Sequence, residues 1–354
     1  MMERTYVFNG KPLCEGSPSG VHRHGYEVMR ELDRMDVDGR MQFVVPVGHG
    51  GDFSFERMEV VEVAASFPGC PWASWTFPTY VRKVGGVGVD LLCSLPPWGC
   101  AIELVPDCIA ELFPQDFTTA AGKRGRRWHM SRVRKVVRTT SFVVTGSECA
   151  KSDIVRMYGV DASKVRVVPC AWQHVTRVEP DEGALARFGL TSGGYFFMLG
   201  HRTYHKNFRW VLEAARQNPE HTFVVTGLRS TENADAYADE DNPSNLLYTG
   251  YLTDEEIVAL MAGCKAFVHP ALYEGFGIPP LEAMALGARC LVSTGGSLPE
   301  VYGDAVTYFD PLAYDHIDMD ELLAHEPAGS AEDCLARYSW KRSAQIVYDC
   351  MQRC

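Results

Sequence analysis

Short apolar runs alternate with longer stretches of helical pattern along the chain. The runs of strand length fall into two series, residues 5–9, 42–47, 60–64, 87–93, 101–105, 142–145 and 165–169, and then 195–199, 222–226, 246–249, 266–269, 289–293 and 305–309. Helical patterns separate most of them, at 21–34, 123–138, 147–158, 206–217, 254–263 and 280–287. Short, wholly apolar strands that alternate with helices are typical of parallel sheets covered on both faces. The two series predict an α/β protein with two doubly wound, Rossmann-like parallel-sheet domains.

The break between the two series indicates the domain boundary. Residues 173–194 are polar, rich in Glu, Asp and Gly, and lack strand periodicity. We predict an N-terminal domain over 1–175 and a C-terminal domain over 176–337. The final stretch, 338–354, has the pattern of an amphipathic helix, and we expect it to pack back toward the N-terminal domain.

The composition is that of a globular protein. Apolar residues make up 46% of the chain and charged residues 22%, which excludes a disordered or low-complexity chain. No stretch reaches the roughly 18 uninterrupted apolar residues of a membrane helix, and residues 1–8 lack the basic-then-apolar build of a secretion signal. We therefore expect a soluble protein of the cytoplasm. The twelve cysteines include no Cys-x-x-Cys pair, which argues against zinc-knuckle and thioredoxin-like sites.

The net charge of −11 is unevenly distributed. Residues 1–175 hold 21 Lys and Arg against 19 Asp and Glu, whereas residues 176–354 hold 13 against 26. A chain this acidic is not a general nucleic-acid binder, and we expect no nucleic-acid partner.

The segment with the most informative chemistry is residues 267–285. A strand is predicted to end at His269 and a helix to begin near Pro279, because proline suits a first helical turn. Glycines between them let the backbone approach a ligand closely, and exposed amides at a helix start can hold phosphate. Glu274 in the loop and Glu282, predicted in the first helical turn, can then face one crevice. The alternative is a solvated loop residue and a carboxylate that merely favours the positive helix end.

This segment resembles the Glu-x7-Glu element of the retaining glycosyltransferases of family 4, which have the two-domain GT-B fold. Further stretches are similar to the family's pattern in the same order, at residues 16–21, 143–148, 158–160, 167–169, 199–207, 247–252, 295–300 and 339–340. The resemblance spans nearly the whole chain and is more specific in the C-terminal half. It implies two domains that face each other across a cleft.

The candidate residues for donor binding follow from chemistry and from this resemblance. A nucleotide sugar's diphosphate gains negative charge as it leaves, so positive groups aimed at it are the largest expected catalytic contribution. Arg202 and Lys206 follow a predicted strand and could clamp the diphosphate; otherwise they are surface cations. The resemblance implies that Glu274 holds sugar hydroxyls and Glu282 the ribose hydroxyls. It also implies donor contacts from Gly20, Leu247, Tyr248, Gly275, Phe276, Gly277 and Ile278, with Leu247 and Tyr248 beside the base.

The sequence departs from the family in one place. Where the family often has a His-Asp pair after an N-terminal strand, this chain has Pro106 and Asp107. Asp107 could orient an acceptor hydroxyl. The missing imidazole is either dispensable or supplied by another group, for which His22 and His24 are candidates; alternatively, both are exposed helix residues.

We expect neither an essential metal nor a cofactor beyond the nucleotide-sugar co-substrate. The Asp-x-Asp matches at 36–38, 239–241 and 318–320 fall in polar turns or helix ends, and such short matches are common by chance. Arg202 and Lys206 already provide the positive charge that a metal would supply.

A basic segment stands out in the N-terminal half. Residues 123–138 contain eight Lys and Arg, and no acidic residue occurs between Asp116 and Glu148. We take seven of these cations as candidates for membrane or acceptor contact: Lys123, Arg124, Arg126, Arg127, Arg132, Arg134 and Lys135. Trp128, Met130, Val133 and Val137 are available for an apolar side, a pattern that suits an anionic bilayer. The alternatives are a solvated face, or cations that bind an acceptor's phosphate.

Together these features predict a retaining glycosyltransferase. It would move a hexose, with a preference for mannose, from a nucleoside-diphosphate sugar to a glycan or lipid-linked acceptor in surface polysaccharide or glycolipid synthesis. The N-terminal domain would bind the acceptor and the C-terminal domain the donor, on the inner face of the cell membrane. Two alternatives remain open: another GT-B enzyme, such as a phosphorylase or a sugar-nucleotide epimerase, and a non-catalytic GT-B partner subunit.

Overall fold

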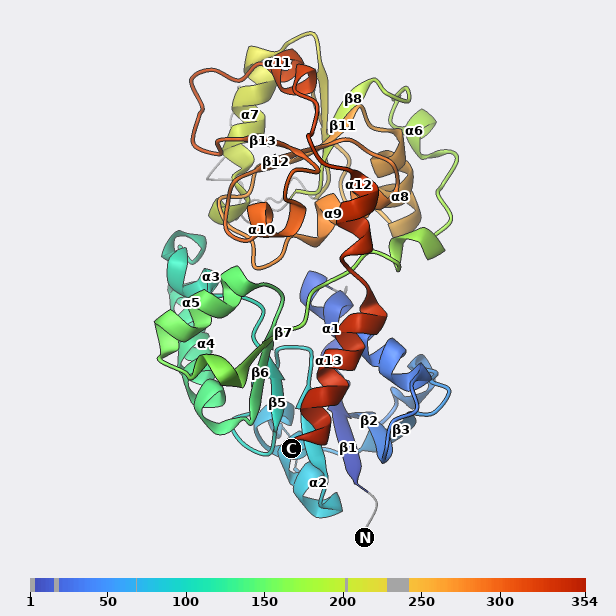
Figure 1. Ribbon diagram of the computed structural model, residues 1–354, viewed down its shortest axis with the longest axis vertical. Helices are drawn as coiled ribbons and strands as arrows, with labels where there is room; N and C mark the ends of the chain where they lie inside the picture. Colours follow the sequence, from blue (N-terminus) through green and yellow to red (C-terminus); the bar gives the residue numbers. More distant parts are fainter. Residues whose placement is uncertain (1–3, 16–18, 68, 201–202, 228–241) are drawn as a thin grey trace. The chain divides into compact units, whose positions relative to one another are not determined.

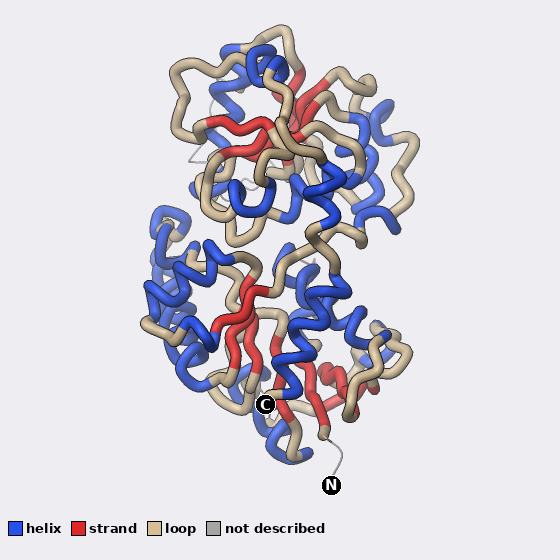
Figure 2. The backbone as a smooth tube through the Cα atoms, in the orientation of Figure 1, coloured by secondary structure: helices blue, strands red, loops and turns tan. Residues whose placement is uncertain are grey.

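The computed structural model describes residues 4–15, 19–67, 69–200, 203–227 and 242–354 (Figure 1). The chain forms two compact units, residues 1–170 together with 339–354, and residues 171–338. The chain therefore passes between the units twice, five residues before the first predicted boundary and one residue after the second. Figure 2 shows the strands inside each unit with helices and loops around them.

Unit 1 contains a parallel sheet of seven strands in the order β3-β2-β1-β4-β5-β6-β7. The strands are β1 Thr5–Asn9, β2 Arg40–Pro46, β3 Glu59–Val63, β4 Val87–Asp90, β5 Ile102–Leu104, β6 Phe142–Thr145 and β7 Val165–Val167. The strand order reverses between β1 and β4, and in such sheets ligands bind beyond the carboxyl ends of the strands at that point.

The main helices of unit 1 are α1 Gly20–Arg34, α2 Phe77–Val84, α3 Ile109–Leu112, α4 Ala120–Thr139, α5 Glu148–Tyr158 and α13 Trp340–Gln352. The C-terminal helix α13 belongs to this unit and packs on α1 (Figure 1). The rings of Trp340 on α13 and His24 on α1 lie 5.9 Å apart. Ser343 Oγ donates a hydrogen bond to the carbonyl of Pro169 at 2.6 Å, close to the point where the chain leaves the unit.

Unit 2 repeats the design with six parallel strands in the order β10-β9-β8-β11-β12-β13. The strands are β8 Tyr195–Met198, β9 Thr222–Val225, β10 Leu246–Tyr248, β11 Ala266–His269, β12 Cys290–Ser293 and β13 Thr307–Phe309. The helices are α6 Ala184–Arg187, α7 Phe208–Gln217, α8 Asp254–Gly263, α9 Ile278–Ala285, α10 Leu298–Tyr302, α11 Met319–Ala324 and α12 Ala331–Ala336. Here the order reverses between β8 and β11.

The core of unit 2 explains why its strands read as continuous apolar runs. Every residue of β8 and β11 is buried, because helices or loops cover both faces of the sheet. Trp210 of α7 stacks on Phe309 of β13 with ring centroids 4.2 Å apart, which fixes α7 against the sheet. No helix among the described residues is both long enough and apolar enough to cross a membrane.

Candidate active site

The loops that follow β8 and β11 meet at the switch point of unit 2. The amide of Leu272 donates to the carbonyl of His205 at 2.7 Å. Asn207, with a left-handed backbone (φ 56°), donates from Nδ2 to the carbonyl of Pro270 at 3.0 Å. These bonds tie the loop after β8 to the loop after β11, so side chains from the two loops come within contact distance.

Lys206 and Glu274 form an ion pair at this junction, in which Glu274 is buried and Lys206 is partly buried. Lys206 Nζ lies 2.6 Å from Glu274 Oε1, and His269 Nε2, at the end of β11, lies 2.9 Å from the same oxygen. Glu274 is only 7% exposed. Burial alone would raise the pKa of Glu274, but the Lys206 ammonium and the hydrogen bond from His269 outweigh it and hold the pKa well below its usual value.

His269 completes this arrangement as a neutral donor. Burial lowers the pKa of its imidazole below the ordinary value of 6.5, so the ring is uncharged at pH 7. A carboxylate oxygen can only accept, and therefore Nε2 carries the hydrogen of the bond to Glu274. The loop thus presents a carboxylate that stays ionised beside an ammonium, a pair able to bind hydroxyl groups and phosphate oxygens.

Glycines shape the backbone between Glu274 and α9. Gly277 has φ +86°, and a Cβ atom there would lie 2.5 Å from Leu298 Cδ2. Ser297 donates from its amide at 3.1 Å and from its hydroxyl at 3.0 Å to the carbonyl of Glu274. Tyr302 Oη donates to the carbonyl of Gly277. These contacts fix the turn that leads into α9. Pro279 and Pro280 have no N–H, so the amides at the helix start that could face an anion are those of Gly277 and Ile278.

Glu282 was predicted in the first turn of α9 but lies just beyond it. Because the helix begins at Ile278, Glu282 is its fifth residue and lies in the second turn rather than the first. Its Oε1 lies 2.6 Å from Nε2 of His174. Sequence analysis did not predict that His269 contacts Glu274 or that His174 contacts Glu282. His269 is recognisable in the sequence as the polar end of a strand, whereas His174 lies in the polar stretch that we assigned to the domain boundary.

The other predicted donor contacts are spread over both units. Tyr248, at the end of β10, packs against the core of unit 2 with its ring 6.0 Å from that of Phe208, and its Oη bonds to Asn242 Oδ1 at 3.2 Å. Phe276 packs edge-on against Tyr338 at 5.3 Å. Gly20 is the first residue of α1 in unit 1. Arg202 lies outside the described residues, so its predicted role stays a prediction.

The predicted acceptor-side residues occupy structural positions in unit 1. Asp107 accepts a hydrogen bond from the amide of Ile109 at 2.9 Å, at the start of α3. His22 closes a capping box with Ser19 at the start of α1. His24 is buried, and burial lowers its pKa to about 4. The reading of His24 as an exposed helix residue is therefore wrong, because its ring packs against Trp340.

A buried acidic network, which sequence analysis missed, lies at the switch point of unit 1. Asp90, at the end of β4, accepts from Asn9 Nδ2 and from the amide of Leu92, both at 2.9 Å. Glu103 on β5 is paired in register with Asp90, and its Oε1 accepts from the amide of Leu95 at 3.1 Å. Both carboxyl groups are fully buried, and burial raises the pKa of each.

The basic segment forms the helix α4, and the apolar side of this helix packs against the core of unit 1. Val133, Val136 and Val137 are buried in the core of unit 1, because α4 packs its valines against β6 and its neighbours. The prediction that Val133 and Val137 are available for a membrane is therefore wrong. The outer face is polar and carries exposed Trp128 together with five of the candidate cations, Lys123, Arg124, Arg127, Arg134 and Lys135.

The two remaining candidate cations of α4 are engaged within unit 1. Arg126 Nε donates to the carbonyl of Ala110. Arg132 donates to Ser74 Oγ at 2.7 Å, and its guanidinium lies 5.2 Å from the ring centroid of Trp128.

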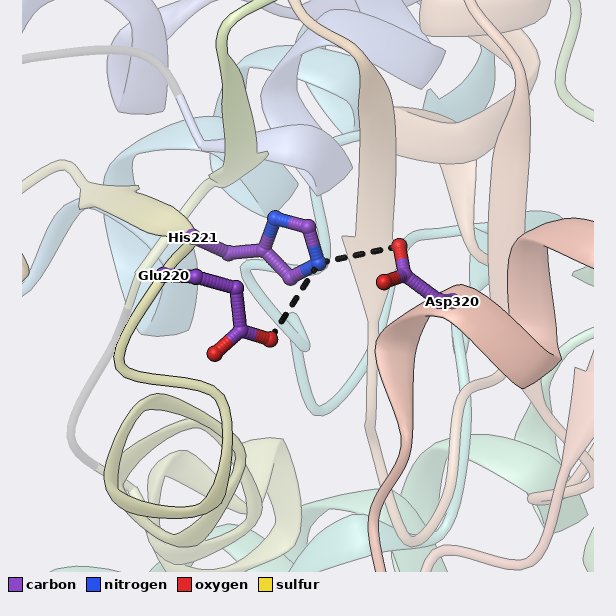
Figure 3. A group of neighbouring side chains, drawn as sticks. All are labelled: Glu220, His221 and Asp320. Carbon is purple, nitrogen blue, oxygen red and sulfur yellow. Dashed lines mark hydrogen bonds and ion pairs between the residues drawn. The ribbon is translucent and has the colours of Figure 1, made fainter.

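Within the described part of the chain, one group of side chains has the spacing of a metal site: Glu220, His221 and Asp320 (Figure 3). His221 Nε2 lies 3.0 Å from Asp320 Oδ1 and 3.7 Å from Glu220 Oε1. His221 directly precedes β9, so the group lies at the amino ends of the strands, away from the loops that carry Lys206 and Glu274. The hydrogen bond between His221 and Asp320 accounts for the approach of these two side chains. Among the Asp-x-Asp matches, Asp318 caps α11, and residues 239–241 lie outside the described residues.

The architecture of the two units identifies the fold. Two doubly wound parallel-sheet units are the GT-B fold of glycosyltransferases. Solved structures share it along the whole chain: Anabaena HepE in complex with UDP-glucose has a TM-score of 0.71 at 14% identity, covering 99% of this chain and 100% of that one. Sucrose-phosphate synthase from Thermosynechococcus elongatus also has a TM-score of 0.71 at 14% identity, with coverages of 99% and 98%.

Residues 190–320 match the family model of glycosyl transferases group 1, so unit 2 contains a group 1 glycosyltransferase domain. The O-antigen chain mannosyltransferase B of Escherichia coli is 30% identical over 218 residues, which are 58% of this chain and 54% of that protein. The MMP alpha-(1->4)-mannosyltransferase of Mycolicibacterium hassiacum is 30% identical over 209 residues, 56% of this chain and 48% of that protein. The matches thus span about half the length of these relatives.

Proposed function

We propose that this protein is a retaining glycosyltransferase that moves a hexose, mannose by preference, from a nucleoside-diphosphate sugar to a glycan or lipid-linked acceptor. The observation that carries the proposal is the partly buried Lys206–Glu274 pair beside the glycine-rich entry to α9, within the region that matches the family model of glycosyl transferases group 1. An ammonium next to an ionised carboxylate suits a nucleotide sugar, in which a phosphate and sugar hydroxyls are close together.

The proposed roles follow from charge. Lys206, together with Arg202, stabilises the negative charge that develops on the leaving diphosphate. Glu274 accepts hydrogen bonds from sugar hydroxyls, and the backbone from Gly275 to Ile278 holds the sugar and phosphate. The bond from the anomeric carbon to the diphosphate oxygen breaks, and the acceptor oxygen bonds to that carbon on the same face. The leaving phosphate takes the acceptor's proton, so no protein base is required.

The preference for mannose and for a surface-glycan acceptor is supported by the relatives. The Escherichia coli protein that matches over 58% of this chain is named an O-antigen chain mannosyltransferase, and a second one, serotype-specific mannosyltransferase WbdA, is 42% identical over 113 residues. Because the matched regions cover only part of these proteins, the donor is best identified by direct binding.

The decisive experiment measures thermal stability of the protein with GDP-mannose, GDP-glucose, UDP-glucose and UDP-galactose, followed by nucleotide release on addition of a mannosyl acceptor. A donor at 100 times its Kd stabilises the folded state by about 2.7 kcal/mol. We expect the largest shift from GDP-mannose, with GDP released only when an acceptor is present. Binding without release would indicate a partner subunit, and conversion of the sugar without an acceptor would indicate an epimerase. Release of sugar 1-phosphate from a glycan by orthophosphate would indicate a phosphorylase.

We propose that the exposed face of α4 contacts an anionic membrane or the phosphate of a lipid-linked acceptor. Its exposed cations and Trp128 suit the headgroup region of a bilayer. Since a cation near an anionic surface contributes about 1 kcal/mol, Arg124→Gln with Arg127→Gln should lower binding to phosphatidylglycerol vesicles about 10-fold or more. Arg82→Gln with Lys83→Gln, two exposed cations of α2, is the matched control. Equal binding by both variants would contradict this proposal.

A further inference from the structure

The segment just after the first crossing between the units is anchored within unit 2. Trp172 donates from Nε1 to the carbonyl of Leu335 at 3.0 Å, and Gln173 donates from Nε2 to the carbonyl of Tyr338 at 2.9 Å. These two bonds attach residues 172–173 to the chain at the end of α12. These bonds therefore hold in place the backbone that leads to the next residue, His174.

The side chain of His174 reaches α9 and contacts Glu282. The distance from Nε2 to Glu282 Oε1 is 2.6 Å, short enough for a charge-assisted hydrogen bond. The His174 side chain is 5% exposed and that of Glu282 is 16% exposed. Because a carboxylate only accepts, Nε2 donates the hydrogen.

The contact uses only one of the two carboxylate oxygens. Among the residues that the structure describes, no other side chain bonds to the carboxylate of Glu282, so Oε2 is left to accept from a ligand. Leu281, Ala283 and Met284, the neighbours of Glu282 on α9, are buried apolar side chains. Glu282 is thus a single polar group on a largely apolar helix, and His174 is the group that sets its direction.

We propose that His174 is a positioning residue for the ribose of the donor: it holds Glu282 by one oxygen and leaves the other for the ribose hydroxyls. This inference rests on the proposed function and on the contact with the ribose hydroxyls that the family resemblance implies for Glu282. A glutamate that is already held loses less side-chain freedom when the ligand binds, and so binds more tightly. His174 itself does not touch the ribose in this account.

A purely structural role for His174 makes a different prediction. If His174 only filled space next to α9, its replacement would weaken every nucleotide to the same degree. If it positions Glu282, the loss is confined to nucleotides that carry ribose hydroxyls. The dependence on those hydroxyls therefore separates the two roles.

The experiment measures Kd by calorimetry for GDP and UDP and for their 2′,3′-dideoxy forms. We expect the protein to prefer the ribose form of its nucleotide by about 10- to 100-fold, the effect of hydrogen bonds to a charged group. His174→Phe keeps the ring volume and removes the donor; it should weaken the ribose form by about 10-fold and leave the dideoxy form unchanged. His174→Gln, which keeps an N–H donor, should restore part of the preference. His174→Ala replaces the phenylalanine variant if that variant does not fold.

Two further variants complete the test. Glu282→Gln should remove most of the ribose preference, and adding His174→Phe to it should have little further effect. The matched control is His221→Phe, because His221 also bonds to a carboxylate of unit 2, that of Asp320 at 3.0 Å; it should leave both affinities unchanged.

The outcomes distinguish this inference from the proposed function. Equal weakening of both nucleotide forms by His174→Phe, or an unchanged ribose preference, would overturn the role of His174. Equal binding of both forms by the unmodified protein would overturn it too, while leaving nucleotide-sugar transfer intact. A protein that binds neither nucleotide, with no donor detected by thermal shift, would overturn the proposed function and this inference with it.

Discussion

Each unit buries a glutamate near the switch point of its sheet, and the pKa values of the two are shifted in opposite directions. Glu103 in unit 1 is fully buried; its Oε2 has no hydrogen-bond partner among the described residues. Burial, and then the neighbouring carboxyl of Asp90, raise the pKa of Glu103 well above its usual value. Glu274 in unit 2 is almost as deeply buried, but the adjacent ammonium of Lys206 holds its pKa down.

This difference shows that burial alone does not decide the charge of an acid. A buried carboxyl group without a cation binds a proton, whereas one with a close cation stays ionised. The acids of unit 1, whose pKa values are raised, serve the backbone: Glu103 and Asp90 accept from the loop 92–95, in which Cys93 and Leu95 have left-handed φ values of 55°. The ionised type in unit 2 is available to a ligand.

The largest effect is expected when the charge of Glu274 is removed. Glu274→Gln keeps the shape of the side chain but removes the ionised acceptor, and loss of one such electrostatic contact should lower turnover by about 100-fold. Nucleotide release under saturating donor and acceptor is the measurement. Glu220→Gln is the control. Glu220 lies at the amino ends of the strands, away from Glu274, and this variant should keep normal turnover. Normal turnover in Glu274→Gln as well would contradict the site.

The second prediction concerns the loss of the ammonium next to Glu274. Without it, Glu274 becomes a buried acid that, like Glu103 among the described residues, lacks an ion-pair partner. Lys206→Met leaves the Glu274 carboxylate buried without its cation, which should lower the free energy of unfolding by about 3 kcal/mol. The double variant Lys206→Met with Glu274→Gln removes the uncompensated charge and should recover most of that loss. Urea unfolding at pH 7 measures both. A double variant no more stable than Lys206→Met would show that the pair is not coupled.

The third prediction concerns the pH dependence of stability. Because the folded protein raises the pKa of Glu103 above 4.5, folding binds a proton there, and stability falls as the pH rises above 4.5 toward the folded value. The slope approaches about 1.4 kcal/mol per pH unit for one proton. Glu103→Gln should flatten this fall in melting temperature between pH 5 and 8.

Glu274 has the opposite dependence. Its pKa is lowered on folding, so its contribution is present above pH 4.5 and is lost as the pH falls below that value. Glu103→Gln should therefore leave the acid side of the stability curve unchanged. Asp90 is present in both proteins, so a difference between their stability curves reports on Glu103. If the two curves were identical between pH 5 and 8, the raised pKa of Glu103 would be contradicted.

The sequence alone was sufficient for the architecture of both units. Continuous apolar runs predict buried parallel strands, and all thirteen strands of the two sheets overlap a predicted run. The loop from His269 to α9 was also predictable, because a strand end, two glycines and two prolines follow one another within a few residues. Features of this kind depend on neighbours in sequence, and the backbone preferences of those neighbours decide them.

The errors have a different origin. Val133 and Val137 of α4 look available for a membrane in sequence, but a helix pattern does not say which surface its apolar side covers. His24 looks exposed beside a glycine-rich loop, yet α13, more than 300 residues later, covers it. In both cases the partner is remote in sequence.

The chain by itself determined which residues become strands, helices and loops, because local periodicity and turn chemistry are properties of short segments. Only the tertiary structure decided which side chains meet. Lys206 and Glu274 are 68 positions apart and His174 and Glu282 are 108 apart. The charge of a buried acid depends on such remote partners and on the exclusion of water around them. Neither these contacts nor the resulting charge could be predicted from the order of residues.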